Sequence, residues 1–323
     1  GCFAAGQLPG VATVFLSMGA ILNVVLPVFA IMAAGYISGR AGILGLDSSR
    51  ALNGFVYYAA LPALFFGSLA DTPLSAILHW DFIAVYGLGL LLVLLPSALI
   101  ARGLLGGRIE LSTLHGMSAI FSNTGYMGVP LLMLAFGQEG LLPAIITTAL
   151  HGTLVIIAGI AVLELGRARD DSGPGPLRMA GLAVLRNPLF LSAIAGLLWA
   201  ATAQPLPEPI KNFLDILGAA AGPCALFAIG LFMVGRPLRA GLGEVLWICL
   251  LKLVALPLLV AWLAFSVFEL EPLWAKSAVI QAALPTGALI FVLASSYDVY
   301  VQRATSVILL STLLSIVSLS VLF

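Results

Sequence analysis

Two short stretches of the sequence combine residues that unwind helices with residues that donate hydrogen bonds. They are Asn123-Thr124-Gly125-Tyr126 and Pro285-Thr286-Gly287, and each interrupts a long apolar segment. Proline lacks an N–H group and disfavours helix at the residue before it, whereas glycine tolerates unwound backbone. Unwinding leaves a helix N-terminus with free N–H groups and a partial positive charge. Two such ends that face each other bind an anion without a charged side chain, so we predict an anion site at these residues.

Three further polar side chains lie inside apolar segments. Lys252 lies roughly 12 Å from the start of its segment at ~1.5 Å of rise per residue, too deep to reach water easily. We predict that Lys252 balances the charge of an anionic ligand or of a helix C-terminus. For His151 a core histidine with satisfied hydrogen bonds is favoured, and a proton carrier is the alternative. Gln281 is a second candidate for a proton or coupling role, whereas His79 and His115 lie near segment ends and are predicted to be interfacial.

The composition indicates the environment in which such a site must work. Of the 323 residues, 61% are hydrophobic and 9% are charged, the net charge is zero, and the mean hydropathy is +1.14. Soluble domains carry roughly a quarter charged residues, so soluble enzymes and nucleic-acid-binding proteins are excluded. An intramembrane enzyme would need a nucleophile–base pair, an HExxH helix or an aspartate dyad, and none is found in the sequence. We predict an all-α membrane protein that is not an enzyme and has no metal or cofactor.

Apolar segments that could cross a membrane recur along the chain. At about 20 residues per spanning helix, we mark ten: Ile21–Ser38, Leu52–Ala70, Phe82–Ala101, Leu114–Phe136, Leu141–Leu163, Pro188–Ala203, Phe213–Val234, Gly243–Val267, Ala275–Ser296 and Val301–Phe323. Arginines concentrate in alternate loops, which places those loops in the cytoplasm and both chain termini on the outer side. We therefore predict a multi-pass protein of the cell (inner) membrane.

The two halves of the chain resemble each other. Three prolines of the first half recur 161 residues later, as the pairs Pro27 and Pro188, Pro62 and Pro223, and Pro96 and Pro257. Each half holds five segments, an odd number, so the second half enters the membrane in the opposite orientation, as in many transporters. A break in one segment alone would favour a simple proline kink with back-bonded Ser or Thr, but two breaks in register favour a binding site at the midplane.

This repeat also divides the chain into parts. We predict an outer N-terminal segment (1–19), a first five-helix repeat (20–165), a cytoplasmic linker (166–187) and a second, inverted five-helix repeat (188–323). The linker is rich in Gly, Pro and charged residues, which is typical of a solvated connection between two halves.

The sequence resembles the auxin efflux carrier family, including its bacterial members that carry malonate and other organic anions. The resemblance is clearest in FSNTGYMGVPLL (Phe121–Leu132) and AVIQAALPTGALIFVLASSYDV (Ala278–Val299). It implies ten helices, with spans 1, 2, 6 and 7 as a scaffold and the others as a transport domain. It also implies crossing fourth and ninth helices, with Asn123 and Pro285 as the crossover residues, and elevator-type movement. Ser122 stands where the plant carriers have a proline, and this bacterial-type pattern favours a carboxylate smaller than auxin.

Together these observations predict a secondary transporter of a small organic anion, a carboxylate such as malonate or an auxin-like acid. The expected partners are this carboxylate, the lipid bilayer, a proton or sodium ion, and a second copy of the chain in a homodimer; no nucleic acid is expected. The alternative is a sodium- or proton-coupled symporter of the bile-acid-transporter type, which shares the broken helices.

Overall fold

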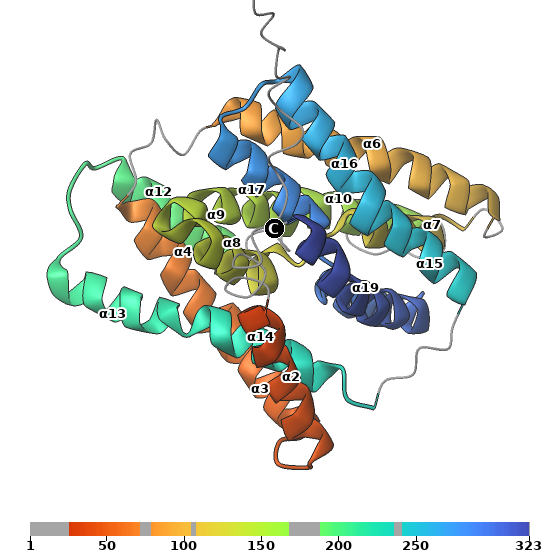
Figure 1. The fold of residues 1–323 in the computed structure, drawn as a ribbon, viewed down its shortest axis with the longest axis horizontal. Coiled ribbons are helices and arrows are strands. Elements are labelled where there is room, and N and C mark those ends of the chain that lie inside the picture. Colours follow the sequence, from red (N-terminus) through yellow and green to blue (C-terminus); the bar gives the residue numbers. More distant parts are fainter. Residues whose placement is uncertain (1–25, 72–78, 105–107, 168–187, 236–240, 323) are drawn as a thin grey trace, which may run out of the picture.

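The computed structural model describes residues 26–71, 79–104, 108–167, 188–235 and 241–322, and their regular secondary structure is helical (Figure 1). The expected outer segment 1–19 and nearly all of the expected linker 166–187 lie outside the described residues. The α-helices are α2 (Leu26–Arg40), α3 (Leu46–Phe55), α4 (Leu61–Ala70), α6 (Trp80–Leu104), α7 (Ile109–Ile120), α8 (Val129–Phe136), α9 (Leu141–Leu150), α10 (Ile156–Arg167), α12 (Pro188–Ala200), α13 (Glu208–Ala219), α14 (Ala221–Phe232), α15 (Leu242–Leu250), α16 (Leu256–Trp262), α17 (Pro272–Ala283), α18 (Leu289–Ser296) and α19 (Val301–Leu322).

Within the described part of the chain, six continuous helical stretches are long and apolar enough to cross a membrane. They are Asp47–Ala70, Trp80–Gly103, Thr124–Leu150, Glu208–Phe232, Leu242–Val267 and Val301–Leu322. Two shorter apolar helices, α2 and α12, begin the two halves of the chain. The expected fourth and ninth segments are each divided between two helices, α7 with α8 and α17 with α18. The protein is therefore an all-helical, multi-span membrane protein.

Prolines shape the longer helices from within. Three five-residue π-helical turns each end two residues before a proline: η2 (Val56–Ala60) before Pro62, η3 (Thr124–Gly128) before Pro130, and η6 (Leu251–Ala255) before Pro257. A proline removes one helical hydrogen bond and its ring crowds the carbonyl one turn earlier, so the turn ahead of it widens. Further short turns are η4 (Gly137–Gly140), η5 (His151–Val155) and η7 (Leu263–Val267).

The helices form two groups with separate apolar cores. The α2–α14 group comprises α2, α3, α4, α12, α13 and α14, and the α6–α19 group comprises α6, α7, α10, α15, α16 and α19. In Figure 1, α2, α3 and α13 lie on one side, α6, α15 and α16 on the other, and α8, α9 and α17 between them. Together, these central helices contribute side chains to both apolar cores.

The two most extensive helix pairings each join one helix of the first half to one of the second: α2 with α14, and α4 with α12. Glycines allow both approaches. A Cβ at Gly35 would overlap the carbonyl of Phe227, and a Cβ at Gly196 would crowd the carbonyl of Phe66. The α2–α14 group is thus built from both halves of the chain.

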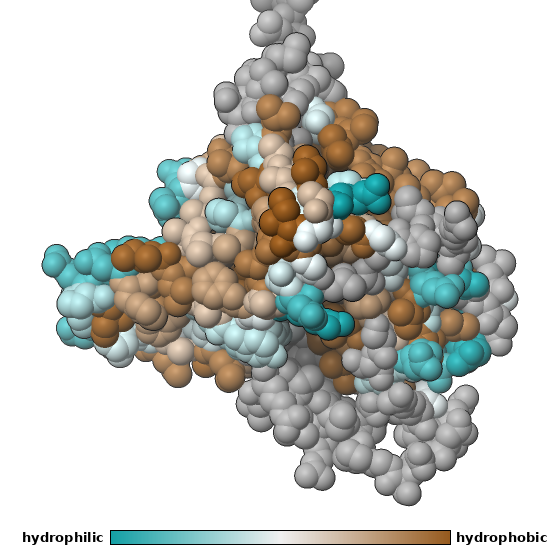
Figure 2. Space-filling view, turned by 90° about the horizontal axis from the view of Figure 1, so that it is seen from below, coloured by the Kyte–Doolittle hydropathy of each residue, from teal (hydrophilic) through white to brown (hydrophobic). Residues whose placement is uncertain are grey.

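The outer surface is largely apolar. Many large apolar side chains are exposed, and Leu99, Ile216 and Val317, for example, are 69, 77 and 66% exposed. Exposing so much apolar surface to water would be unfavourable. Figure 2 shows apolar residues over much of one face, with hydrophilic residues gathered in a few groups. Such a surface suits contact with lipid chains.

Candidate functional site

The two expected breaks meet each other in space. Helix α7 ends at Ile120 and α17 at Ala283, and the next residues of each chain segment are extended. Ser122 lies opposite Thr286 as an antiparallel pair. The N–H of Asn123 donates to the carbonyl of Pro285 at 2.9 Å, and the N–H of Gly287 donates to the carbonyl of Phe121 at 2.9 Å. We call residues 121–128 and 284–287 the crossing.

This pairing uses several donors that the sequence analysis expected to be free. The N–H groups of Asn123 and Gly287 bond across the crossing, and the N–H of Thr286 donates to the Ser311 hydroxyl at 3.1 Å. The Thr286 hydroxyl itself donates to the carbonyl of Ser118 at 2.9 Å. The expectation of uncommitted N–H groups is therefore wrong for these three residues. Buried backbone without water must find internal partners, and the two breaks satisfy each other.

Open hydrogen-bonding groups remain on the Asn123 side of the crossing. The first intrahelical bonds run from the N–H groups of Met127 and Gly128 to the carbonyl of Asn123, both at 3.1 Å. The N–H groups of Thr124, Gly125 and Tyr126 therefore form the first turn of the helical run η3–α8, which ends at Phe136, and such a turn has no intrahelical acceptors. The Asn123 side chain is half-buried and makes no hydrogen bond within the described part of the chain.

Tyr126 is turned away from these donors. Its hydroxyl donates to the carbonyl of Asn53 at 3.3 Å, which joins the crossing to α3 of the α2–α14 group. Gly125 lies close to both a central helix and the same group, because a Cβ there would be 3.3 Å from the Thr148 methyl and 3.7 Å from Leu61 Cδ1. The Asn123 side of the crossing therefore lies against the α2–α14 group and the central helix α9.

Lys252 lies behind the crossing and is fully buried. Its ammonium donates to the carbonyl of Ala282 at 2.6 Å, in the last turn of α17. The last carbonyls of a helix have no intrahelical donors and carry a partial negative charge, so a cation is favoured there. Of the two partners expected for Lys252, the described residues supply the helix C-terminus.

His151 is buried against the corresponding end of the other broken helix. Its Nε2 lies 3.1 Å from the carbonyl of Ile120, the last residue of α7, and its Nδ1 lies 3.0 Å from the carbonyl of Thr147. The ring also packs edge-on against Tyr86 and Phe121, with ring centres 5.5 and 5.2 Å away. His151 and Lys252 thus each contact the C-terminal carbonyls of one broken helix.

Gln281 carries the least satisfied polar group near the crossing. The side chain is fully buried, and neither its oxygen nor its nitrogen has a hydrogen-bond partner among the described residues. It lies directly against Gly128, where a Cβ would overlap the amide oxygen. The buried hydroxyls of Tyr86 and Ser122 face each other but do not reach hydrogen-bond geometry. Burying a polar group without a partner destabilises the fold by about 1–3 kcal/mol. Such a group therefore calls for an explanation, and a functional role is one.

Comparison with known proteins identifies the family of the chain. A family model described as "Membrane transport protein" matches residues 20–323. The chain belongs to the auxin efflux carrier family of membrane transporters. This is a family of transporters and not of enzymes.

Two relatives of the transporter match most of its length, and a plant relative matches less than half of it. It is 33% identical over 307 residues to the "Putative malonate transporter" of Rhizobium meliloti, covering 94% of this chain and 95% of that protein. It is 30% identical to an "Uncharacterized transporter" of Methanothermobacter thermautotrophicus, covering 91% and 95%. Similarity to "Auxin efflux carrier component 6" of Arabidopsis thaliana is 27% over 146 residues, covering 43% of this chain and 25% of that protein.

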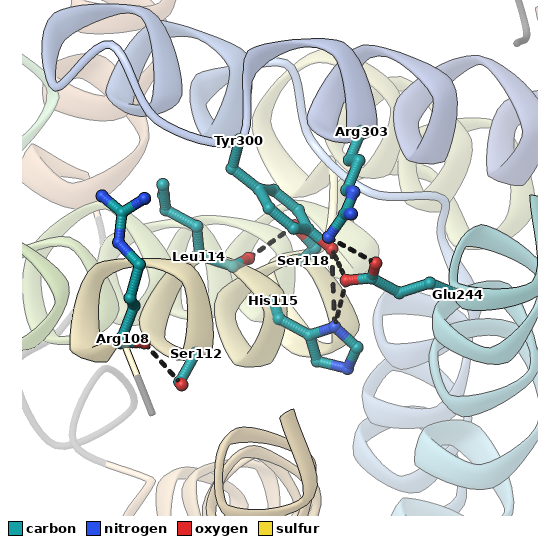
Figure 3. Close-up of polar contacts among 8 residues, drawn as sticks. All are labelled: Arg108, Ser112, Leu114, His115, Ser118, Glu244, Tyr300 and Arg303. Atoms are coloured by element: carbon teal, nitrogen blue, oxygen red, sulfur yellow. Dashed lines mark hydrogen bonds and ion pairs between the residues drawn. The ribbon is translucent and has the colours of Figure 1, made fainter. Parts of the chain in front are cut away.

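The transporter also contains a polar cluster that the sequence analysis missed. Figure 3 shows His115 of α7, Glu244 of α15, Tyr300 directly before α19, and Arg303 of α19 pointing toward one another, and we call these four residues the Glu244 cluster. His115 Nδ1 lies 2.8 Å from Glu244 Oε1, Arg303 Nη1 lies 2.8 Å from Oε2, and the Tyr300 hydroxyl donates to Oε1. Burial and the bond to Glu244 raise the pKa of the Tyr300 phenol, which keeps it a donor.

His115 was expected to be interfacial, but in the structure it is buried. Its position near a segment end suggested contact with water, yet α15 and α19 cover it and supply its partner. The only signals in the sequence were a glutamate and an arginine near the ends of apolar segments, and these do not reveal which residue pairs with which.

Proposed function

We propose that this protein is a secondary transporter of a small carboxylate, such as malonate, which binds at the crossing beside Asn123. The observation that carries the proposal is the half-buried Asn123 amide, which has no hydrogen-bond partner among the described residues and stands at the open first turn of a helix. An amide offers both a donor and acceptors, and a helix N-terminus favours a negative charge. The name of the Rhizobium meliloti relative supports malonate as the first ligand to test.

Each residue of the proposed site has a distinct role. Asn123 orients the carboxylate, and the N–H groups of Thr124, Gly125 and Tyr126 bind its oxygens. Pro285, Thr286 and Gly287 hold the opposite segment in place through the bonds across the crossing. Lys252 adds positive charge, and His151 and Gln281 are the residues to which we assign coupling.

We further propose that ten spans form two inverted five-helix repeats, residues 20–165 and 188–323, joined by a cytoplasmic linker, with both termini outside. Three features support this arrangement. Exchanging the two halves of the chain converts the helix pair α2–α14 into the pair α12–α4. Gly35 and Gly196 lie at the close approaches of these two pairs. At the crossing, each broken segment donates one backbone hydrogen bond to the other. The α6–α19 group would then move past the α2–α14 group in an elevator-type cycle.

Binding of malonate to the purified protein tests the proposed site. Replacing Asn123 by Ala removes one hydrogen bond to a charged ligand, which costs about 1.5–3 kcal/mol, or roughly tenfold to a hundredfold in dissociation constant. Helical content and the unfolding temperature should not change. The measurement is calorimetry in detergent or nanodiscs.

The matched control is Asn212→Ala, because Asn212 is exposed on α13, and this variant should bind malonate like the wild type. Wild-type affinity in Asn123→Ala would place the site elsewhere. Absence of binding by the wild type, tested with malonate and with monocarboxylates, would contradict the proposed function itself.

A further inference from the structure

Two basic side chains make equivalent contacts at the C-terminal ends of the two broken helices. His151 contacts the carbonyl of Ile120, three residues before Asn123, and Lys252 contacts the carbonyl of Ala282, three residues before Pro285. Both side chains are buried, with exposed fractions of 1% and 0%. Each therefore places a positive or potentially positive group at the negative end of a helix, next to the crossing.

The surroundings of His151 suit a ring that carries two protons. A carbonyl oxygen only accepts hydrogen bonds, and both ring nitrogens of His151 face one, at 3.0 and 3.1 Å. A neutral imidazole has a single N–H and can donate to one of these carbonyls, leaving a lone pair directed at the other. The doubly protonated ring donates to both. The geometry thus favours the bound proton.

The charge balance opposes that proton when the site holds no ligand. Lys252 lies within electrostatic reach of the His151 ring, and Tyr86 of α6 is the other titratable side chain that faces it. Among the described residues, no carboxylate forms a hydrogen bond or ion pair with His151 or Lys252. Two buried positive charges repel each other strongly where little water screens them. Within the described part of the chain, no bonded carboxylate balances these two charges.

We propose that His151 binds a proton together with the transported carboxylate, so that the protein is a proton–carboxylate symporter. This inference rests on the proposed function, because the bound carboxylate supplies a balancing negative charge. One proton from solution adds to the unprotonated ring nitrogen, which then donates to a backbone carbonyl. Binding free energies are reciprocal, so the anion strengthens proton binding and the proton strengthens anion binding by the same factor.

Proton uptake on ligand binding is the direct test. Malonate is titrated into the purified wild type by calorimetry in two buffers of different ionisation enthalpy at the same pH. We expect uptake of about one proton per bound ligand and, above neutral pH, an affinity that falls by up to about tenfold per pH unit. In His151→Gln, the glutamine amide can still donate to the carbonyl of Ile120, so malonate should still bind. The number of protons taken up per ligand, obtained from the difference between the two buffers, should fall by one.

His79→Gln is the matched control, because His79 is half-exposed, stacks on Trp274 and should not alter proton uptake. Malonate can itself take up a proton, so undiminished uptake in His151→Gln would overturn the inference while leaving the proposed function intact. If His151→Gln does not fold, the wild type still decides: an affinity that is unchanged from about pH 6 to about pH 8 would overturn the proposal. If the wild type binds no carboxylate, the proposed function fails first.

Discussion

The crossing and the Glu244 cluster are both buried and polar, but they satisfy their polar groups to very different extents. In the Glu244 cluster one carboxylate is contacted by a histidine of α7, an arginine of α19 and the tyrosine directly before α19. At the crossing, the amide of Gln281 has no partner and Lys252 contacts only a carbonyl among the described residues. A carboxylate with three partners stabilises one arrangement of helices, although Nε2 of His115 in the same cluster is buried without a described partner, whereas a buried amide with no partner at either polar atom retains capacity for a ligand. We therefore propose a structural role for the first region and a binding role for the second.

The largest expected effect is a loss of malonate affinity, with little loss of stability, when Lys252 is replaced. In Lys252→Met a similar volume remains but the positive charge is lost, so malonate affinity should fall by about a hundredfold, equivalent to about 3 kcal/mol. The free energy of unfolding should change much less, because the ammonium has a single hydrogen-bond partner among the described residues and its removal from water is costly. Transport and binding assays beside denaturant unfolding in detergent measure both. Lys276→Met, at an exposed position of α17, is the control and should leave malonate affinity unchanged.

Glu244→Leu should show the opposite pattern. Removing the carboxylate leaves His115 and Tyr300 buried without their acceptor and Arg303 without its ion pair, so the free energy of unfolding should fall by about 3 kcal/mol. Malonate affinity of the protein that remains folded should stay close to that of the wild type. The exposed Glu271→Gln serves as the control. A large loss of affinity without loss of stability would mean that the Glu244 cluster takes part in binding.

The smallest expected effect is an increase in stability, at Gln281. Methionine matches the length of Gln281 without its polar atoms, so Gln281→Met should stabilise the ligand-free protein by about 1–2 kcal/mol and reduce transport. The unfolding midpoint without ligand and the initial rate of malonate uptake are the measurements. Gln302→Met, exposed on α19, should change neither. Destabilisation by Gln281→Met would remove the distinction between the two regions.

The breaks themselves could be located from the sequence because their causes are local. Pro285 cannot donate a helical hydrogen bond, and the glycines around Asn123 permit unwound backbone wherever they occur. The fates of the freed N–H groups could not be predicted in the same way. Thr286 was expected to offer donors, but Ser118 and Ser311 bind them, and these acceptors lie far away in sequence. His115 was placed at the interface for the same reason, since its partner is 129 residues distant.

The sequence by itself determined that the chain spans a membrane many times and belongs to a transporter family, because hydropathy and the crossover motifs are properties of contiguous residues. It also determined that Lys252 is buried, since its depth in an apolar segment leaves no short path to water. Only the tertiary structure decided that Lys252 and His151 each contact the end of a broken helix, and that Glu244 gathers its three partners. Those pairings depend on how helices from both halves pack, and a local pattern of residues carries no information on which distant groups will meet.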